Sequence, residues 1–198
     1  ISFWQVFLTV SVLSIFIYCS GIFHSRAHDI QPIVANISVV EDQVQLDLSL
    51  NIEIALSEID ASLVTDTNDS KNADAYDALR QLNSEKLKTE IRSNADVFLD
   101  KVMLTVEDRL LALDITGISV EEDVDLSLPR RTTITLMAKL PSNNVPVVVA
   151  LDKTLGAFAI RQQDPSIDPD DLYTDYISAG QASKPIHRGE KIERPWQE

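Results

Sequence analysis

Regular alternation of hydrophobic and polar positions is the strongest pattern in the chain. From residue 30 to 40, and again from 44 to 54, apolar side chains recur at every second residue, and the polar triplet Glu41-Asp42-Gln43 separates the two segments. A period of two over this length predicts two half-buried strands joined as a hairpin. We therefore expect the folded domain to begin with β structure.

The pattern changes between residues 70 and 99. Residues 65–70, Thr-Asp-Thr-Asn-Asp-Ser, are rich in loop-forming and helix-capping types. Residues 73–81 then predict a short helix, and Ser84 is a suitable cap for a second helix that runs to about residue 99. The sequence thus predicts a helical hairpin inserted into a β domain.

Strand patterns return after residue 100. They cover segments 102–106, 110–115, 118–128, 132–140, 146–151 and 155–161. Short strands separated by turn residues are typical of a sandwich. The predicted fold is mainly β, an immunoglobulin-like β-sandwich with a helical hairpin inserted at about residues 70–99.

The first thirty residues differ in kind from the rest. Ile1 to Phe23 contains no charged residue, and the small-x-small triplet Ser25-Arg26-Ala27 follows it. This combination predicts a secretory signal peptide over residues 1–27. An uncleaved N-terminal membrane anchor is the alternative, because the apolar run matches the ~20 residues that span a bilayer. Both interpretations place the rest of the chain outside the cytoplasm, on the periplasmic side of the inner membrane.

Composition argues against a nucleic-acid partner and against disulfide bonds. Cleavage after Ala27 removes one base, Arg26, and no acid, so the formal charge of −14 becomes −15. A surface this acidic repels nucleic acid, and we expect no nucleic-acid partner. The single cysteine, Cys19, lies in the apolar run. The mature part therefore has no disulfide and depends on a hydrophobic core for stability.

The end of the chain predicts a linker. From residue 164 to 198 the sequence has no hydrophobic periodicity and contains Gly180, Pro185, Gly189 and Pro195. We expect a β-sandwich domain over residues 28–163, followed by a linker toward a membrane domain that lies beyond this chain.

No enzyme motif occurs in the sequence. It contains no nucleophile elbow, phosphate-binding glycine loop, CxxC pair or HExxH sequence, so we expect no enzymatic activity. The acidic clusters at 121–125 and 168–171 lack the glycine that calcium loops need for their sharp turn, which favours solvated loops. Arg130-Arg131, after Pro129, is interpreted as the start of a strand.

His28 is the strongest candidate for chemistry. After cleavage it would be the first residue, and its α-amine and Nδ1 together form a chelate suited to Cu²⁺, Ni²⁺ or Zn²⁺. Asp29 can add an oxygen ligand, and His187 is the other histidine of the mature part. Two histidines are few for zinc, which normally has three or four protein ligands. The alternative is that His28 is simply the residue that follows the cleavage site.

Several short motifs occur in a recognisable order. They are Ala27-His28-Asp29-Ile30-Gln31-Pro32, then Asp66-Thr67-Asn68-Asp69-Ser70 leading into Tyr76-Asp77-Ala78-Leu79-Arg80, then Leu128-Pro129-Arg130, Leu155-Gly156-Ala157-Phe158-Ala159-Ile160-Arg161-Gln162-Gln163, and Tyr173-Thr174-Asp175-Tyr176 with Gly180 and Pro185. Over about residues 25–195 this order resembles the extracytoplasmic N-terminal region of long HupE/UreJ-type membrane proteins, the hydrogenase/urease accessory family.

The resemblance implies a function in metal uptake. In that family the soluble region precedes a polytopic membrane domain associated with nickel or cobalt uptake, and the His/Asp motif tied to metal passage lies in the membrane helices. No transport residue can be carried over to this chain, but the N-terminal histidine matches at His28. The resemblance also implies a partner, the C-terminal membrane domain of the same parent chain. The missing helices or an uncleaved N-terminal anchor would provide membrane association.

Two other functions remain open at this point. The chain would be a free-standing periplasmic metal carrier if no membrane domain follows it. It would be a scaffold or partner-binding domain if it has no role with metal.

Overall fold

The computed structural model describes residues 30–40, 42–122, 125–126, 128–141, 145–164 and 167–187. The predicted signal peptide or apolar anchor helix at 1–27, and the metal candidates His28 and Asp29, lie outside these ranges. Within them, no helix is both long enough and apolar enough to cross a membrane.

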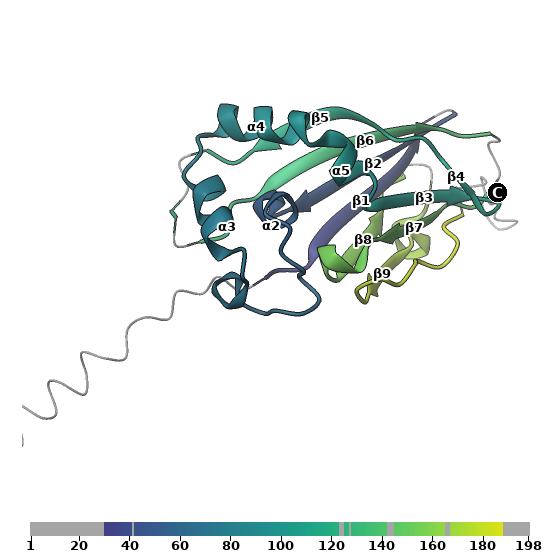
Figure 1. The fold of residues 1–198 in the computed structure, drawn as a ribbon. Helices are drawn as coiled ribbons and strands as arrows, with labels where there is room; N and C mark the ends of the chain where they lie inside the picture. Colours follow the sequence, from purple (N-terminus) through teal and green to yellow (C-terminus); the bar gives the residue numbers. More distant parts are fainter. Residues whose placement is uncertain are drawn as a thin grey trace, which may run out of the picture.

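The larger of two layers is a six-stranded sheet (Figure 1). In spatial order its strands are β5 (Asp114–Val120), β6 (Thr132–Lys139), β2 (Gln43–Leu50), β1 (Ile33–Val40), β8 (Phe158–Gln162) and β9 (Thr174–Ile177). All neighbours are antiparallel except β1 and β8, which run parallel. The predicted N-terminal hairpin is confirmed, with Ile37 of β1 opposite Leu46 of β2.

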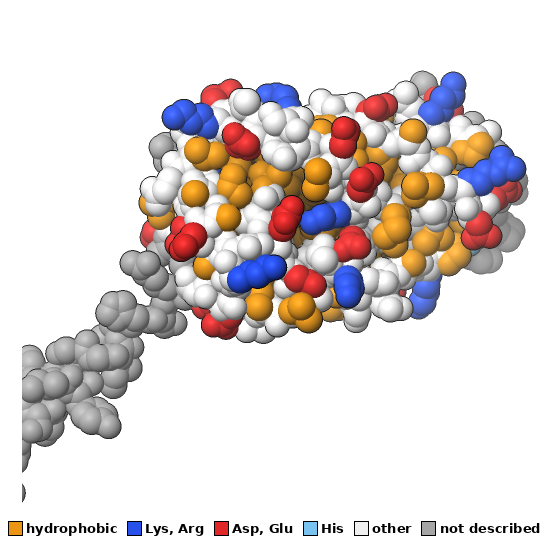
Figure 2. Space-filling model, viewed as in Figure 1, with side chains coloured by type: hydrophobic (Ala, Val, Ile, Leu, Met, Phe, Trp, Pro, Cys, Tyr) orange, Lys and Arg blue, Asp and Glu red, His pale blue; other side chains and the backbone are white. Residues whose placement is uncertain are grey.

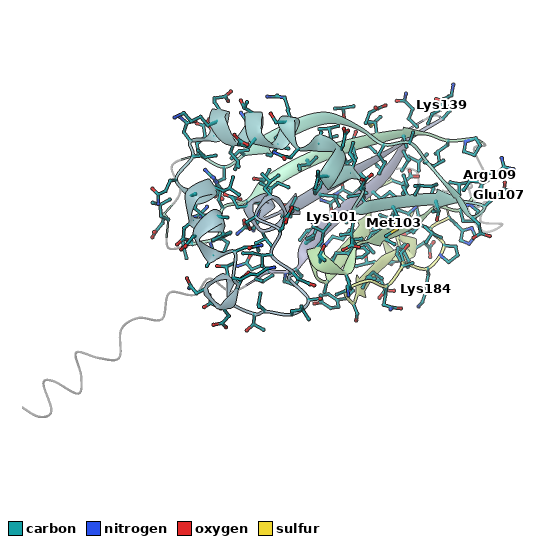
Figure 3. The ribbon with its side chains drawn as sticks, viewed as in Figure 1. Lys101, Met103, Glu107, Arg109, Lys139 and Lys184 are labelled. Carbon is teal, nitrogen blue, oxygen red and sulfur yellow. The ribbon has the colours of Figure 1, made fainter. Side chains whose placement is uncertain are left out.

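The second layer is a three-stranded sheet in the order β4 (Arg109–Leu110), β3 (Val102–Val106) and β7 (Val148–Leu151). Glu107 and Asp108 have φ of 48° and 61° and form the tight turn between β3 and β4, where positive φ matches the twist of a hairpin. Figure 3 shows Glu107 and Arg109 at this turn, and Lys101 and Met103 nearer the other end of β3.

Alternate side chains of both sheets form one core. Val44, Leu46 and Leu48 of β2 are completely buried, and Leu104 and Val149 lie in the same cluster from the small sheet. Their neighbours in sequence are less buried, as the period-two pattern predicts. The prediction of a mainly β, sandwich-like fold is therefore confirmed.

The helical insert is also confirmed, although the second helix, predicted to run from Ser84 to about residue 99, is divided in two at Asn94. It consists of α3 (Ala73–Arg80), α4 (Ser84–Ser93) and α5 (Ala95–Leu99), after the 3-10 turn η1 (Thr67–Asp69). Asn83, one residue before the predicted cap, accepts a hydrogen bond from the Lys86 N–H at 2.9 Å and begins α4. Leu87, Ile91 and Phe98 face the core, so the insert adds one more layer of hydrophobic side chains.

The predicted strand over 44–54 is wrong for residues 51–54. β2 ends at Leu50, and Ile52–Leu56 forms the short helix α2. Ile52 and Ile54 are buried there as they would be in a strand. The helical turn also buries Glu53, which a strand pattern would point to solvent, and the partners of that carboxylate explain the change.

Three other strand predictions shift, the first of them for a topological reason. Segment 110–115 was expected as one strand, but β4 ends at Leu110 in the small sheet and β5 begins at Asp114 in the large one. The chain therefore crosses between layers at 111–113. The strand predicted over 118–128 ends at Val120, and the one predicted from residue 155 begins at Phe158, after the turn η2 (Lys153–Leu155).

The linker prediction for 164–198 is wrong for residues 167–187. This segment contains the turn η3 (Pro169–Asp171) and β9, and isolated bridges join Val147 to Ile186 and Ala150 to Ala182. Buried Gln162 holds it, because its Nε2 donates to the His187 carbonyl at 2.8 Å and its Oε1 accepts from the Tyr173 N–H at 3.1 Å. These side-chain hydrogen bonds help to hold the segment in place although its sequence has no hydrophobic period.

Candidate functional site

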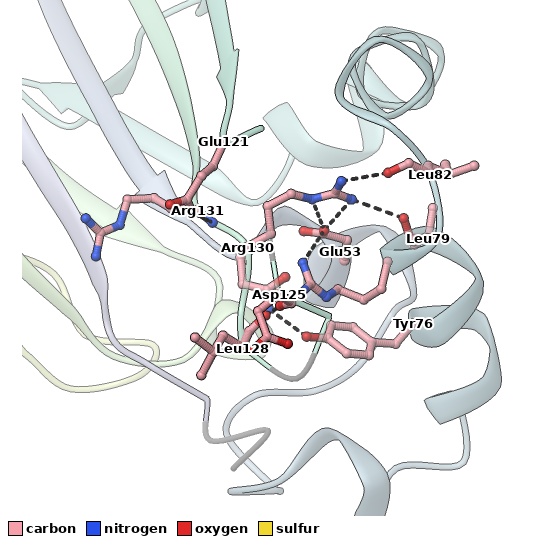
Figure 4. A network of polar contacts seen from close by, with 11 residues as sticks. Glu53, Tyr76, Leu79, Leu82, Glu121, Asp125, Leu128, Arg130 and Arg131 are labelled. Carbon is pink, nitrogen blue, oxygen red and sulfur yellow. Dashed lines mark hydrogen bonds and ion pairs between the residues drawn. The ribbon is translucent and has the colours of Figure 1, made fainter. Parts of the chain in front are cut away.

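Three buried charged side chains meet where the helical insert joins the sandwich (Figure 4). Glu53 of α2 is 0% exposed, and Arg80 at the end of α3 and Arg130 before β6 are each 3% exposed. Charged groups are almost never buried to this extent unless they are paired. We refer to these residues as the Glu53 cluster.

One carboxylate oxygen of Glu53 accepts from both arginines. Arg130 contacts Glu53 Oε1 through Nε at 2.8 Å and through Nη2 at 2.7 Å, and Arg80 Nη1 lies 3.5 Å from the same oxygen. The cluster thus has one negative and two positive groups. Arg130 is the closer partner and makes the stronger pairing.

The remaining guanidinium donors bind backbone carbonyls. Arg130 donates to the carbonyls of Leu82 at 2.7 Å and Leu79 at 3.1 Å, just after and at the C-terminal end of α3. The Leu79 carbonyl also accepts from the Leu82 N–H at 3.1 Å. Arg80 donates to the carbonyls of Asp125, at 3.2 Å, and Leu128, both in the β5–β6 connection. The Glu53 cluster therefore ties α2, α3 and this connection together.

The chemistry of these groups favours a structural role. Guanidinium groups remain protonated at all physiological pH values, so they are poor proton carriers. Glu53 Oε2 and Arg80 Nε have no hydrogen-bond partner in the part of the chain that the structure describes. The cluster holds segments in place, and its geometry offers no reacting pair.

A second polar contact lies beside it. Asn51 Nδ2 donates to the Tyr76 hydroxyl oxygen at 2.8 Å, and Tyr76 packs with Ile54 and Ile59 in a small separate core. Burial raises the pKa of the Tyr76 hydroxyl, and the Asn51 hydrogen bond opposes part of that rise. Tyr76 therefore helps to fix α3 against α2 as a neutral group.

His187 and Ile30, the first described residue after His28 and Asp29, lie toward different ends of β1. The Ile30 N–H donates to the Thr65 carbonyl at 3.0 Å, which fixes the start of the described chain beside η1. His28 and Asp29 lie outside the described residues, but His28 is only two residues from this fixed point. Two fully extended residues span at most about 7 Å, so this is the longest backbone distance that the chain allows between His28 and Ile30.

His187 is exposed at the other end of β1. Its carbonyl binds Gln162, which pairs with Ile37, whereas Ile30 precedes the first residue of the strand, Ile33. Ile33 and Ile37 alone are about 13 Å apart at the usual strand rise. The structure therefore does not bring His187 toward the segment that leads to His28.

Within the described ranges, no group of three or more His, Cys, Asp or Glu side chains lies close enough together to hold a metal ion. Two of the acidic residues noted in the sequence have local hydrogen bonds instead. Asp66 Oδ1 accepts from the Asn68 N–H at 2.8 Å, and Asp168 Oδ1 accepts from the Asp170 N–H at 3.1 Å. Both carboxylates begin 3-10 turns, a common use of aspartate.

The chain matches no protein-family model and no curated protein. The resemblance to HupE/UreJ-type proteins thus remains a prediction from the order of short motifs.

Proposed function

We propose that the chain is the extracytoplasmic domain of a HupE/UreJ-like membrane protein, that it has no enzymatic activity, and that it takes part in nickel- or cobalt-type metal uptake or handling. The motif order and the uncharged apolar run at the N-terminus support this proposal. The structural observation that carries it is the hydrogen bond from the Ile30 N–H to the Thr65 carbonyl.

This hydrogen bond holds Ile30, which follows His28 by two residues in the sequence. A terminal His28 would present an α-amine and an imidazole, with Asp29 as a further oxygen donor, a set suited to Ni²⁺, Cu²⁺ or Co²⁺. A nearby fixed point lowers the conformational entropy that the ligands lose on binding. The same loop carries Asp66 and exposed Asp69, and negative charge raises the local concentration of cations. His187 is not needed for this arrangement.

Calorimetric titration tests the metal site directly. Protein that begins at His28 should bind Cu²⁺ more tightly than Ni²⁺, following the usual order for divalent metals. The α-amine must lose its proton to coordinate, so the affinity should rise with pH through about 7.7–8.0.

The matched control carries an acetyl group on the α-amine of His28. Acetylation removes the amine from the chelate and leaves every side chain in place, so the affinity should fall. Equal affinities would mean that His28 is only the residue after the signal peptide.

A partner-binding domain with no metal role is the second candidate, and the open edge of β5 favours it. The remaining alternative, a free-standing periplasmic metal carrier, is separated from a membrane protein by the gene sequence after the Glu198 codon. A stop codon shortly after Glu198 would remove the membrane-protein proposal.

A further inference from the structure

The two sheets protect their edges unequally. At one end of the large sheet β9 has 4 residues, and in the small sheet β4 has 2. The outer side of β7 is bridged by Ala182 and Ile186. β5, at the other end of the large sheet, has 7 residues, and β6 is its single strand partner within the described ranges.

β5 lacks two of the usual protections of an edge strand, lysine and proline, although α4 of the insert contacts it. Natural sheets place lysine, proline or bulges at their edges, because unpaired backbone groups invite another strand. The β5 sequence, Asp-Ile-Thr-Gly-Ile-Ser-Val, contains no lysine and no proline. Its one irregularity is a shift of register between Ile115 and Gly117.

A groove of about 350 Å³ lies along this strand. One wall comes from the helical insert, with Arg92, Ala95 and Leu99, and the other is residues 114–118 of β5. The walls are mainly apolar, and a volume of this size can receive a few side chains. An edge strand beside side-chain pockets is the arrangement used in peptide recognition by strand addition.

Acidic residues outnumber basic ones in and beside the groove. Asp114 lines it, and exposed Asp96 and Asp100 directly follow the lining residues Ala95 and Leu99 in the sequence. Arg92 is the one basic lining residue. Val97, also on α5, is 50% exposed. Figure 2 shows hydrophobic and acidic side chains next to each other over the region of α5 and β5.

We propose that β5 and this groove bind an extended, basic segment of a partner protein, which adds as a further strand at the edge of the large sheet. Its main chain would pair with β5, alternate apolar side chains would enter the groove, and its Lys or Arg side chains would meet Asp96, Asp100 and Asp114. A partner of this charge complements a chain whose formal charge is −14. A second copy of the chain fits less well, because it would bring the same acidic residues.

Fluorescence anisotropy with synthetic probes tests the proposal. The first probe is a short labelled peptide in which lysine alternates with valine, and the second has glutamate in place of every lysine. We expect native protein to bind the lysine peptide at least tenfold more tightly than the glutamate peptide.

Two variants with matched controls locate the site. Ala95→Phe fills the groove, and Asp114→Lys reverses a charge that lines it. Each should weaken binding of the lysine peptide at least fivefold. Their controls, Ala78→Phe and Asp74→Lys, make the same changes at exposed positions of α3 and should stay within twofold of native protein.

Hydrogen exchange of backbone amides tests strand addition directly. Bound lysine peptide should protect backbone amides within 114–120. The proposal is overturned by equal binding of both peptides, by no binding of the lysine peptide, by native affinity in both groove variants, or by protection confined to other strands. The experiments contain a chelator, so their result is independent of the metal-handling function proposed above.

Discussion

Replacing Arg130 with Ala tests whether the Glu53 cluster holds the helical insert to the sandwich. The change removes both short contacts to Glu53 Oε1, at 2.8 and 2.7 Å, and leaves Glu53 with Arg80 Nη1 at 3.5 Å. It also removes the guanidinium donors from the carbonyls of Leu79 and Leu82, although the Leu79 carbonyl keeps the Leu82 N–H.

The expected loss is a large part of the total stability. Removing one partner of a buried ion pair costs about 3–5 kcal/mol. The contact that Glu53 keeps, with Arg80 Nη1 at 3.5 Å, is too long to replace the two short ones. Domains of this size typically have a free energy of unfolding of about 5–15 kcal/mol. We therefore expect Arg130→Ala to lower the free energy of unfolding by about 3–5 kcal/mol. The free energy of unfolding of Arg130→Lys should lie between those of native protein and Arg130→Ala, because one ammonium cannot replace the guanidinium fork.

The assay is urea unfolding followed by circular dichroism, with the neighbouring residue as control. Arg131 is exposed, and its backbone N–H contacts Glu121 Oε2 at 3.1 Å, a bond that Arg131→Ala keeps. That variant should stay within about 0.5 kcal/mol of native protein. If Arg130→Ala and Arg131→Ala unfold at the same urea concentration with the same slope, the cluster does not hold the insert.

Two further predictions concern single residues. Tyr76→Phe removes the hydrogen bond from Asn51 and should cost about 1 kcal/mol at neutral pH. Because burial raises the pKa of Tyr76, its unfolded hydroxyl ionises first, and the stability it contributes is present below about pH 10 and lost above it. Urea midpoints should therefore fall more steeply above pH 10 in native protein than in Tyr76→Phe, and parallel curves would contradict this. Gly156→Ala should cost about 1–3 kcal/mol, because φ is 84° and an added Cβ would lie 3.3 Å from Ala61 Cβ. An unchanged melting temperature would show that the turn relaxes.

Local hydrophobic periodicity was sufficient to predict a helix or strand where one face of that element is buried along its whole length. Val44, Leu46 and Leu48 predicted β2, and Leu87 and Ile91 lie on the buried face of α4 as a helical period requires. The same rule failed at Ile52 and Ile54, because an apolar residue at every second position also suits a short buried helix. In the helix, Glu53 is buried and paired with arginines far along the chain, which local periodicity does not predict.

The Glu53 cluster was missed for a related reason. Glu53 is 27 residues from Arg80 and 77 from Arg130, a separation at which no spacing rule operates. Arg130 was interpreted only as the start of a strand. The available signal was Glu53 itself, a single charge inside the apolar run from Ile52 to Leu56. The linker prediction is wrong for residues 167–187 because the side chains of Gln162 and Tyr173 hold this segment. Hydrogen bonds of this kind produce no hydrophobic periodicity in the sequence.

The most direct test of the proposed function is the N-terminus of the protein isolated from cells that express it with residues 1–27 attached. Intact-mass measurement and N-terminal sequencing of the periplasmic fraction should give a chain that begins at His28, with the free α-amine that the metal chelate requires. A chain that retains residues 1–27 and stays with the membrane would contradict that site, because His28 would then have no α-amine to bind metal.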